Sequence, residues 1–127
     1  MLGIDIIEIA RIKSAVSGAA GERFLEKVFT PREIAYCRSG QAFRYNSLAS
    51  RFAAKEAVAK ALGTGIREFT WTDIEIVNDK LGKPNIVLHN KAKKMAAKLK
   101  VKTIHVSLSH THMLAFASSY LEYKKHK

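Results

Sequence analysis

The run from Arg51 to Gly65 constrains the fold of this chain more than any other segment. It is rich in alanine, carries Glu56 and Lys60 one helical turn apart, and closes on Gly63-Thr64-Gly65. A carboxylate can hold a divalent cation, an ammonium group can neutralise phosphate oxygens, and glycines let backbone N–H groups approach an anion closely. The same two charges also fit an ordinary i,i+4 ion pair on a solvated helix. Both interpretations predict a helix that stops at a glycine.

The expected helix presents two different strips to its surroundings. At about 100° per residue, its apolar stripe consists of Leu48, Phe52, Ala59 and Leu62. The neighbouring strip holds Glu56 and Lys60 together with Ala49 and Ala53. A merely solvated face would carry several long polar side chains, whereas small residues leave room for a ligand beside the charged pair. The strip therefore favours a binding site.

The whole pattern predicts a single α+β domain over residues 1–127. With 127 residues, 47% of them hydrophobic, the chain can bury one compact core. The expected helices cover about Glu8 to Val16, Glu22 to Val28, a short segment that starts at Pro31 and includes Cys37, Asn46 or Ser47 to Gly63, and Asn90 to Leu99. The expected strands are Leu2 to Ile7, Asp73 to Val77, Pro84 to Leu88, Thr103 to Ser109 and Met113 to Tyr123. This order fits a mostly antiparallel sheet with the long central helix packed over one face. The basic tail that ends at Lys127 is expected to be frayed.

The first strand carries an acidic residue, Asp5, inside an apolar run. Strand alternation places Gly3 and Asp5 on one face and Leu2, Ile4 and Ile6 on the other. A desolvated carboxylate is costly unless it meets a cation or hydrogen-bond donors. Asp5 is therefore expected either to cap the helix that follows or to bind a metal ion, and the local sequence leaves both roles open.

A second acidic residue, Glu33, has a structural explanation. Thr30-Pro31-Arg32-Glu33 has the form of a capping box, with Thr30 as the N-cap and Glu33 reaching back to it. The single cysteine, Cys37, cannot form an intramolecular disulfide, and we expect an ordinary buried or half-buried thiol. No cluster of Cys and His residues in the sequence has the spacing of a zinc site.

The charge balance favours an anionic partner. The chain has 22 Lys and Arg residues against 11 Asp and Glu residues, a formal net charge of +11. A nucleic-acid-binding module is the weaker interpretation, because the basic residues are scattered over all elements and Asp5 and Glu56 stay unexplained. The apolar runs are too short to span a membrane and the N-terminus lacks the features of a signal peptide. We therefore expect a cytoplasmic protein.

Several motifs follow one another along almost the whole chain. They are Gly3-Ile4-Asp5 with Arg11-Ile12, Phe29-Thr30 with Glu33, the run Arg51 to Gly65, Gly82-Lys83-Pro84, and Val106-Ser107-Leu108-Ser109-His110-Thr111. Together they closely resemble the holo-[acyl-carrier-protein] synthases of the 4′-phosphopantetheinyl transferase superfamily, whose fold the chain is then expected to share. An interaction protein with an inactive version of that fold is disfavoured, because every matched chemical residue is present.

The resemblance implies a specific reaction. The 4′-phosphopantetheine arm of coenzyme A is transferred to a serine of acyl carrier protein, adenosine 3′,5′-bisphosphate is released, Mg²⁺ is required, and the product supports fatty acid biosynthesis. The resemblance assigns Asp5 and Glu56 as metal ligands and Lys60 as the residue that stabilises charge on the pyrophosphate. The serine hydroxyl would attack the β-phosphorus without a covalent enzyme intermediate. Glu56, directly or through a metal-bound water, is the expected proton acceptor, and Glu33 is the alternative.

The resemblance also implies where the substrates bind. The coenzyme A contacts are Lys60, Gly63, Thr64, Gly65, Lys83, Pro84, Ser109, His110 and Thr111. Arg11 matches the carrier-binding arginine of the family, Arg23 and Phe24 resemble a second contact, and an acidic carrier would suit the net charge of +11. Ala15 stands where the family often has a larger apolar residue. Members that resemble this chain form homotrimers with active sites between neighbouring subunits.

Overall fold

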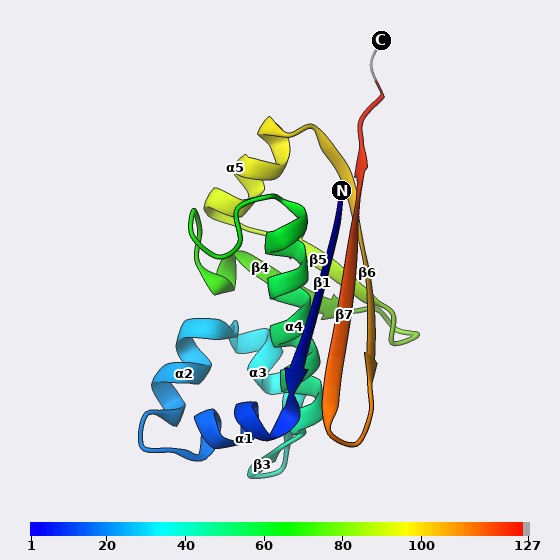
Figure 1. Cartoon of the computed structure of the whole chain (residues 1–127). Coiled ribbons are helices and arrows are strands. Elements are labelled where there is room, and N and C mark those ends of the chain that lie inside the picture. The colour runs from blue at the N-terminus through cyan, green and yellow to red at the C-terminus, as the bar shows by residue number, and fades with distance from the viewer. Residues whose placement is uncertain (126–127) are drawn as a thin grey trace.

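Three antiparallel strands form the main sheet of the computed structural model, which describes residues 1–125 (Figure 1). The strands are β1 (Leu2–Glu8), β7 (Leu114–Tyr123) and β6 (Val101–His110), in the spatial order β1-β7-β6. The register pairs Asp5 with Ala117 of β7, and Ala117 with Leu108 of β6. These three side chains therefore share one face of the sheet. Two residues of the tail that was expected to fray, His126 and Lys127, lie outside the described residues.

Helix α4 (Tyr45–Ala61) packs along the Asp5 face of this sheet, on the side where Figure 1 shows the other helices. The approach is close at Gly3, where a Cβ atom would lie 1.9 Å from the backbone oxygen of Ala57. Any larger residue there would force β1 away from the helix. The close approach brings Asp5 beside Glu56 and Lys60 of α4. The expected antiparallel sheet with a long helix over one face is confirmed.

Helix α4 is buried on nearly all sides rather than along one stripe. Of the predicted apolar stripe, Leu48, Ala59 and Leu62 are buried and Phe52 is half-buried. Lys55, which lies outside that stripe, is fully buried as well. The alanines of α4 are spread around all sides of the helix and define no single apolar side. The sequence pattern therefore could not show how many elements pack against the helix. The predicted stripe is therefore too narrow.

Local capping signals predict the helix ends well. Helix α4 begins at Tyr45, directly before the predicted start, and Gly63 follows its end with φ +93°, the left-handed conformation. Helix α3 (Pro31–Cys37) has the predicted capping box. The Glu33 N–H donates to the Thr30 hydroxyl oxygen at 3.2 Å, and the Thr30 N–H donates to the Glu33 carboxylate at 2.9 Å.

Helices α1 (Ile9–Ser17) and α2 (Gly21–Val28) pack against each other, and α1 also contacts α4. The backbone of α2 approaches that of α1 closely at Gly21, where a Cβ atom would lie 1.8 Å from the backbone oxygen of Val16. The core on this side includes Ile12, Leu25 and Leu48, all of them buried. The α1–α2 pair is thereby fixed beside the end of β1 (Figure 1).

The second half of the chain adds a hairpin and a helix beside α4. A short 3-10 helix, η1 (Trp71–Asp73), leads into β4 (Ile74–Asn78), which pairs with β5 (Pro84–Leu88) in the predicted antiparallel hairpin. Helix α5 (Asn90–Lys98) follows. A small hairpin of β2 (Arg38–Ser39) and β3 (Ala42–Phe43) was not predicted, because two-residue strands carry no alternation. Across residues 1–125, no helix is both long and apolar enough to pass through a membrane.

Candidate active site

Asp5 and Lys60 form an ion pair between β1 and α4. The Nζ atom of Lys60 lies 3.0 Å from Oδ1 of Asp5 and donates a second hydrogen bond to the backbone oxygen of Ile4 at 3.1 Å. Asp5 is half-buried, and its side chain lies on the helix side of the sheet. It does not cap the following helix, whose N-cap residue is Glu8. Of the two roles that the sequence left open for Asp5, capping is therefore wrong.

Glu56 faces the same region from α4. Partial burial raises the pKa of Glu56 above its usual value, the negative charge of Asp5 raises it further, and Lys60 partly opposes the change. Among residues 1–125, no side chain or backbone N–H forms a hydrogen bond or an ion pair with the Glu56 carboxylate. Lys60 thus contacts Asp5 and not Glu56, so the ordinary i,i+4 pair on a solvated helix is absent from the described structure.

The two carboxylates fit a hard divalent cation. They come from different elements, they repel each other, and a bound cation would relieve that repulsion. Mg²⁺ takes only one or two protein carboxylates and completes its shell with water and phosphate oxygens. Within the part of the chain that the structure describes, no group of three or more His, Cys, Asp or Glu residues is placed to hold a metal ion. A site at Asp5 and Glu56 would therefore need ligands from a substrate or from water.

A cavity of about 370 Å³ opens beside this pair. Its walls are Asp5, Ile6 and Ile7 of β1, Arg11, Ile12 and Ala15 of the first helix, Phe24 of α2, and Phe52 and Glu56 of α4. The ring of Phe52 stacks between Phe24, at a centroid distance of 6.4 Å, and Trp71, at 4.7 Å. The site thus has a polar end with both acids, an apolar wall, and an exposed arginine.

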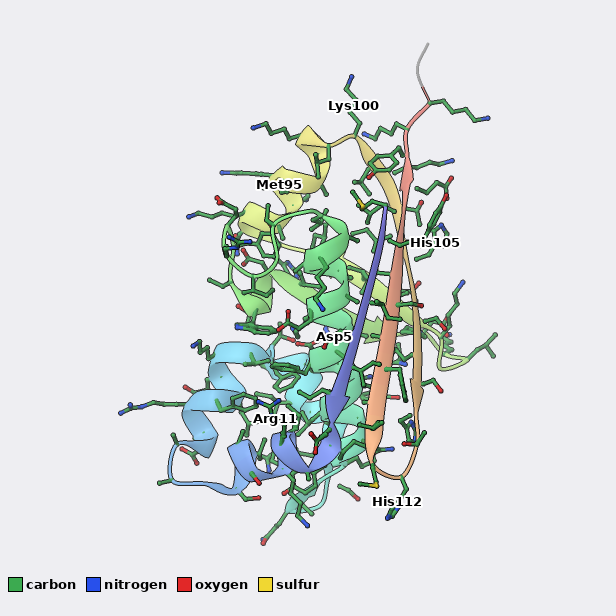
Figure 2. The ribbon with its side chains drawn as sticks, in the orientation of Figure 1. Asp5, Arg11, Met95, Lys100, His105 and His112 are labelled. Atoms are coloured by element: carbon green, nitrogen blue, oxygen red, sulfur yellow. The ribbon has the colours of Figure 1, made fainter. Side chains whose placement is uncertain are left out.

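The residues expected to contact a carrier protein lie partly at this cavity. Figure 2 shows Arg11 on α1, near the end of β1 and on the helix side of the sheet. Phe24 and Ala15 line the same cavity as Arg11. Arg23 is exposed on α2 and is not among the lining residues. The structure therefore groups Arg11 and Phe24 with Asp5 and Glu56.

The glycine loop after α4 has the backbone that its sequence predicts. Gly63 has φ +93° and Gly65 has φ +64°, both in the left-handed region that favours glycine. The Gly65 N–H donates to the backbone oxygen of Ala59 at 3.1 Å, and Arg67 donates from Nε to the backbone oxygen of Thr64 at 3.1 Å. The loop therefore continues directly from the turn of α4 that carries Lys60.

The turn that carries Lys83 and Pro84 is tied to α4 through a side-chain relay. Arg51 of α4 donates from Nη2 to Oδ1 of Asn78, and Asn78 donates from Nδ2 to the backbone oxygen of Gly82 at 2.8 Å. Arg51 is almost fully buried, and its guanidinium lies over the ring of Tyr36. The sequence singled out the run that contains Arg51 but gave this residue no role. The only indication of a role for Arg51 in the sequence was its position at the start of that run.

Ser109, His110 and Thr111 lie away from Asp5 in the same chain. Ser109 pairs with Phe116 on the opposite face of the sheet from Asp5, so the sheet separates the two side chains. Nε2 of His110 lies 3.2 Å from Nδ2 of Asn46, and both residues line a second cavity of about 530 Å³ together with Thr111. One chain therefore brings Asp5, Glu56 and Lys60 together, places Ser109 across the sheet from them, and directs His110 to Asn46 at the start of α4.

Glu33, the alternative proton acceptor, is enclosed in the core. Its Oε1 atom lies 2.8 Å from Nζ of Lys55, and both side chains are fully buried. Its Oε2 atom accepts a hydrogen bond from the N–H of Ile76 at 3.0 Å. Both oxygens are engaged and neither reaches the cavity beside Asp5, so the structure favours Glu56 over Glu33. No sequence pattern indicates that Glu33 and Lys55 are partners, because Lys55 stands as a single lysine among alanines.

Comparison with known proteins identifies related sequences over nearly the whole chain. The sequence model of the 4′-phosphopantetheinyl transferase superfamily matches residues 1–117. A holo-[acyl-carrier-protein] synthase of Ruminiclostridium cellulolyticum is 52% identical over 118 residues, covering 92% of this chain and 87% of that protein. The corresponding synthase of Moorella thermoacetica is 48% identical over 124 residues, covering 94% and 91%.

Solved structures show the same fold. The crystal structure of Helicobacter pylori holo-[acyl-carrier-protein] synthase in complex with coenzyme A superimposes with a TM-score of 0.84 at 34% sequence identity. The match covers 96% of this chain and 100% of that one. The mixed helix and antiparallel-sheet architecture is therefore shared with a protein that binds coenzyme A.

Proposed function

Because the chain belongs to the 4′-phosphopantetheinyl transferase superfamily, we propose that it transfers the 4′-phosphopantetheine arm of coenzyme A to a serine of apo acyl carrier protein. The serine oxygen forms a bond to the β-phosphorus, the bond from that phosphorus to the bridging oxygen breaks, and adenosine 3′,5′-bisphosphate leaves. The observation that carries this proposal is the convergence of Asp5, Glu56 and Lys60, where the two acids line one cavity and Lys60 is paired with Asp5.

Asp5 and Glu56 would hold Mg²⁺ in this site. When bound, Mg²⁺ supplies positive charge that stabilises negative charge on phosphate oxygens. The support is the chemistry of the donors, two carboxylates that repel each other across the β1–α4 contact. One side of the site stays open to the cavity, so substrate oxygens can complete it.

Lys60 and Glu56 would serve the transfer directly. Lys60 is half exposed, and its ammonium can turn from Asp5 toward the pyrophosphate and stabilise the charge that develops as the bond breaks. Glu56 would accept the proton of the serine hydroxyl. Its carboxylate has no other hydrogen bond within residues 1–125, which supports that role.

Coenzyme A would contact the glycine loop at the C-terminal end of α4 and the β4–β5 turn, which Arg51 and Asn78 tie to α4. The proposed contacts are Lys60, Gly63, Thr64 and Gly65, with Lys83 and Pro84 near the adenine and Ser109, His110 and Thr111 near the phosphates. Left-handed glycines support close approach of an anion to the backbone at residues 63–65. Since Ser109 lies on the opposite face of the sheet from Asp5, Ser109 would contact coenzyme A that is bound at the site of a second copy of the chain.

A homotrimer with active sites between subunits is the assembly that we propose. On the sheet face turned away from α4, strand β1 is apolar and open: Leu2, Ile4 and Ile6 are 70%, 63% and 55% exposed. Tyr120 of β7 adjoins them and is also exposed. An apolar face of this kind supports burial against other copies.

The second substrate would be an acidic acyl carrier protein. Arg11 lines the cavity that holds Asp5 and Glu56, so a carrier bound to Arg11 can bring its serine to the site. Phe24 supplies an apolar contact in the same cavity, and Arg23 lies exposed on the same helix as Phe24. The formal net charge of +11 would speed encounter with an acidic protein. We further propose that residues 1–127 form one transferase domain that acts in the cytoplasm in fatty acid biosynthesis.

Mass spectrometry of the carrier tests the proposed reaction. Apo acyl carrier protein mixed with this protein, coenzyme A and Mg²⁺ should gain the mass of one phosphopantetheine. The same mixture with a chelator in place of Mg²⁺ is the control and should show no gain. No mass shift in the complete mixture, together with salt-dependent binding to DNA, would contradict the proposal and support the nucleic-acid alternative.

A further inference from the structure

Lys55, the residue before Glu56, is fully buried and yet has no part in the proposed chemistry. Its Nζ atom lies 2.8 Å from Oε1 of Glu33 and donates hydrogen bonds to the backbone oxygens of Trp71, at 3.1 Å, and Ile74. An ammonium group has three hydrogens, so each of them has a partner. This one side chain ties α4 to α3, η1 and β4.

Glu33 fixes the other end of the ion pair. Oε1 also accepts a hydrogen bond from the Thr30 N–H at 2.9 Å, within the capping box of α3, and Oε2 accepts one from the Ile76 N–H at 3.0 Å in β4. Removing one member of such a pair would leave an uncompensated buried charge, which is costly. Lys55 is therefore held in one position by groups that are themselves held by secondary structure.

Lys55 and Glu56 point in different directions from α4. Successive residues of an α-helix are turned by about 100°, so fixing Lys55 against η1 and β4 directs Glu56 toward β1 and the cavity. On the opposite side, the contact of Gly3 with the backbone of Ala57 sets the separation of β1 from α4. Helix α4 is thus held from two sides, with Glu56 between the two contacts.

The same anchor reaches the cavity wall by a second route. Lys55 donates a hydrogen bond to the backbone oxygen of Trp71. The Trp71 ring stacks on Phe52 at a centroid distance of 4.7 Å and an interplanar angle of 24°. Phe52 lines the cavity beside Glu56. A shift of Trp71 would therefore move the apolar wall as well as the acid.

We infer that Lys55, through its ion pair with Glu33, is a positioning residue that directs Glu56 into the metal site. The inference rests on the proposed function. Apolar residues of similar volume often replace a buried ion pair at little cost in stability, so stability alone does not require these charges. Hydrogen bonds are directional, and three of them from one nitrogen atom define a single orientation of the helix.

Two variants test this inference. Lys55→Met/Glu33→Gln removes both charges together, and Lys55→Arg keeps the charge but cannot present three hydrogens from one nitrogen atom. Mn²⁺ is the metal probe, and its binding in the presence of coenzyme A is followed by electron paramagnetic resonance. We expect folded variants whose Kd for Mn²⁺ rises by about tenfold or more, the effect of disturbing groups that orient a metal ligand. The kcat for transfer should fall while the KM for coenzyme A stays near the wild-type value.

The control is Leu121→Ala, which removes buried side-chain volume from the cluster beside α5 and does not touch the pair. It should lower the melting temperature and leave Mn²⁺ affinity unchanged. A folded Lys55 variant with wild-type Mn²⁺ affinity and kcat would overturn the inference, and so would failure of both variants to fold. If the wild-type protein itself neither binds Mn²⁺ with coenzyme A nor transfers the arm, the proposed function fails instead.

Discussion

The negative charge of Glu56 destabilises the folded protein when no cation is bound. Because its pKa is raised on folding, the folded state holds the Glu56 proton more tightly than the unfolded state. Stability from this group is therefore lost as the pH rises from the ordinary carboxyl range through the folded pKa. Glu56→Gln should raise the melting temperature at pH 7 without Mg²⁺ and reduce transfer by about 100-fold or more, as loss of a general base does.

Thermal unfolding with and without Mg²⁺ and coenzyme A measures how far bound ligands offset the destabilising charge of Glu56. Ligands should raise the melting temperature of the wild-type protein, because they bind only the folded state, and should have less effect on Glu56→Gln. Glu26→Gln, at an exposed position on α2, is the matched control and should change neither property. A Glu56→Gln protein that transfers at the wild-type rate would contradict the assignment.

Substitution of Arg11 should change the KM for the carrier protein but not the KM for coenzyme A. Arg11→Glu places a negative charge in the cavity where an acidic carrier is proposed to bind, so the KM for the carrier should rise by about tenfold or more. The KM for coenzyme A should stay unchanged in steady-state assays. Lys93→Glu, on the exposed face of α5, makes the same change in net charge and should have a much smaller effect. Equal losses for carrier and coenzyme A would count against this role of Arg11.

At the scale of elements, the contact between β1 and α4 depends on Gly3. In Gly3→Ala the new Cβ atom would lie 1.9 Å from the backbone oxygen of Ala57, so the strand must move outward and carry Asp5 away from Lys60. We expect a loss of about 1–3 kcal/mol in urea unfolding, the usual cost of overpacking, and a larger loss of activity than that destabilisation explains. Gly18→Ala is the control, since its nearest heavy atom is 3.3 Å away and needs to move by only a few tenths of an ångström. Equal stability of the two variants would contradict the argument.

Element ends could be predicted from the sequence because their signals are local. The Thr30 and Glu33 capping box, the left-handed Gly63 and the hairpin of β4 and β5 each depend on a few neighbouring residues. The pairing of Asp5 with the α4 strip followed from a resemblance over several motifs, and one chain does bring Asp5 beside Lys60. The element ends depend only on short segments, whereas the contact of Asp5 with Lys60 joins residues far apart in the chain.

The surroundings of α4 could not be predicted in the same way. Lys55 occurs among alanines, and nothing in its neighbourhood shows that Glu33, Trp71 and Ile74 converge on it. These partners come from segments far apart in the chain, and only tertiary packing brings them together. The position of Ser109 across the sheet from Asp5 depends in turn on strand register, which the sequence alone leaves undetermined.

For the whole molecule, the open sheet face links assembly to catalysis. Ile4→Lys should leave the folded subunit intact, because this side chain is 63% exposed. In the proposed trimer the same lysine would be buried without a partner, which is strongly unfavourable. Light scattering should therefore show monomers with a wild-type circular dichroism spectrum and little transfer activity. A monomeric variant with full turnover would show that one chain contains a complete site.

Mixed assemblies provide the sharper prediction. Glu56→Gln and Ser109→Asp should each be inactive alone, since the first removes the proposed base and the second puts a negative charge beside the phosphates that Ser109 is proposed to contact. After joint unfolding and refolding of an equimolar mixture, activity should return to about one quarter of the wild-type value, because each contact draws its two halves from different subunits at random. Native mass spectrometry can confirm that hybrid trimers form. If hybrids form without any regain of activity, Ser109 and Glu56 do not meet across a subunit contact, and the opposite-face placement of Ser109 and Asp5 must have another explanation.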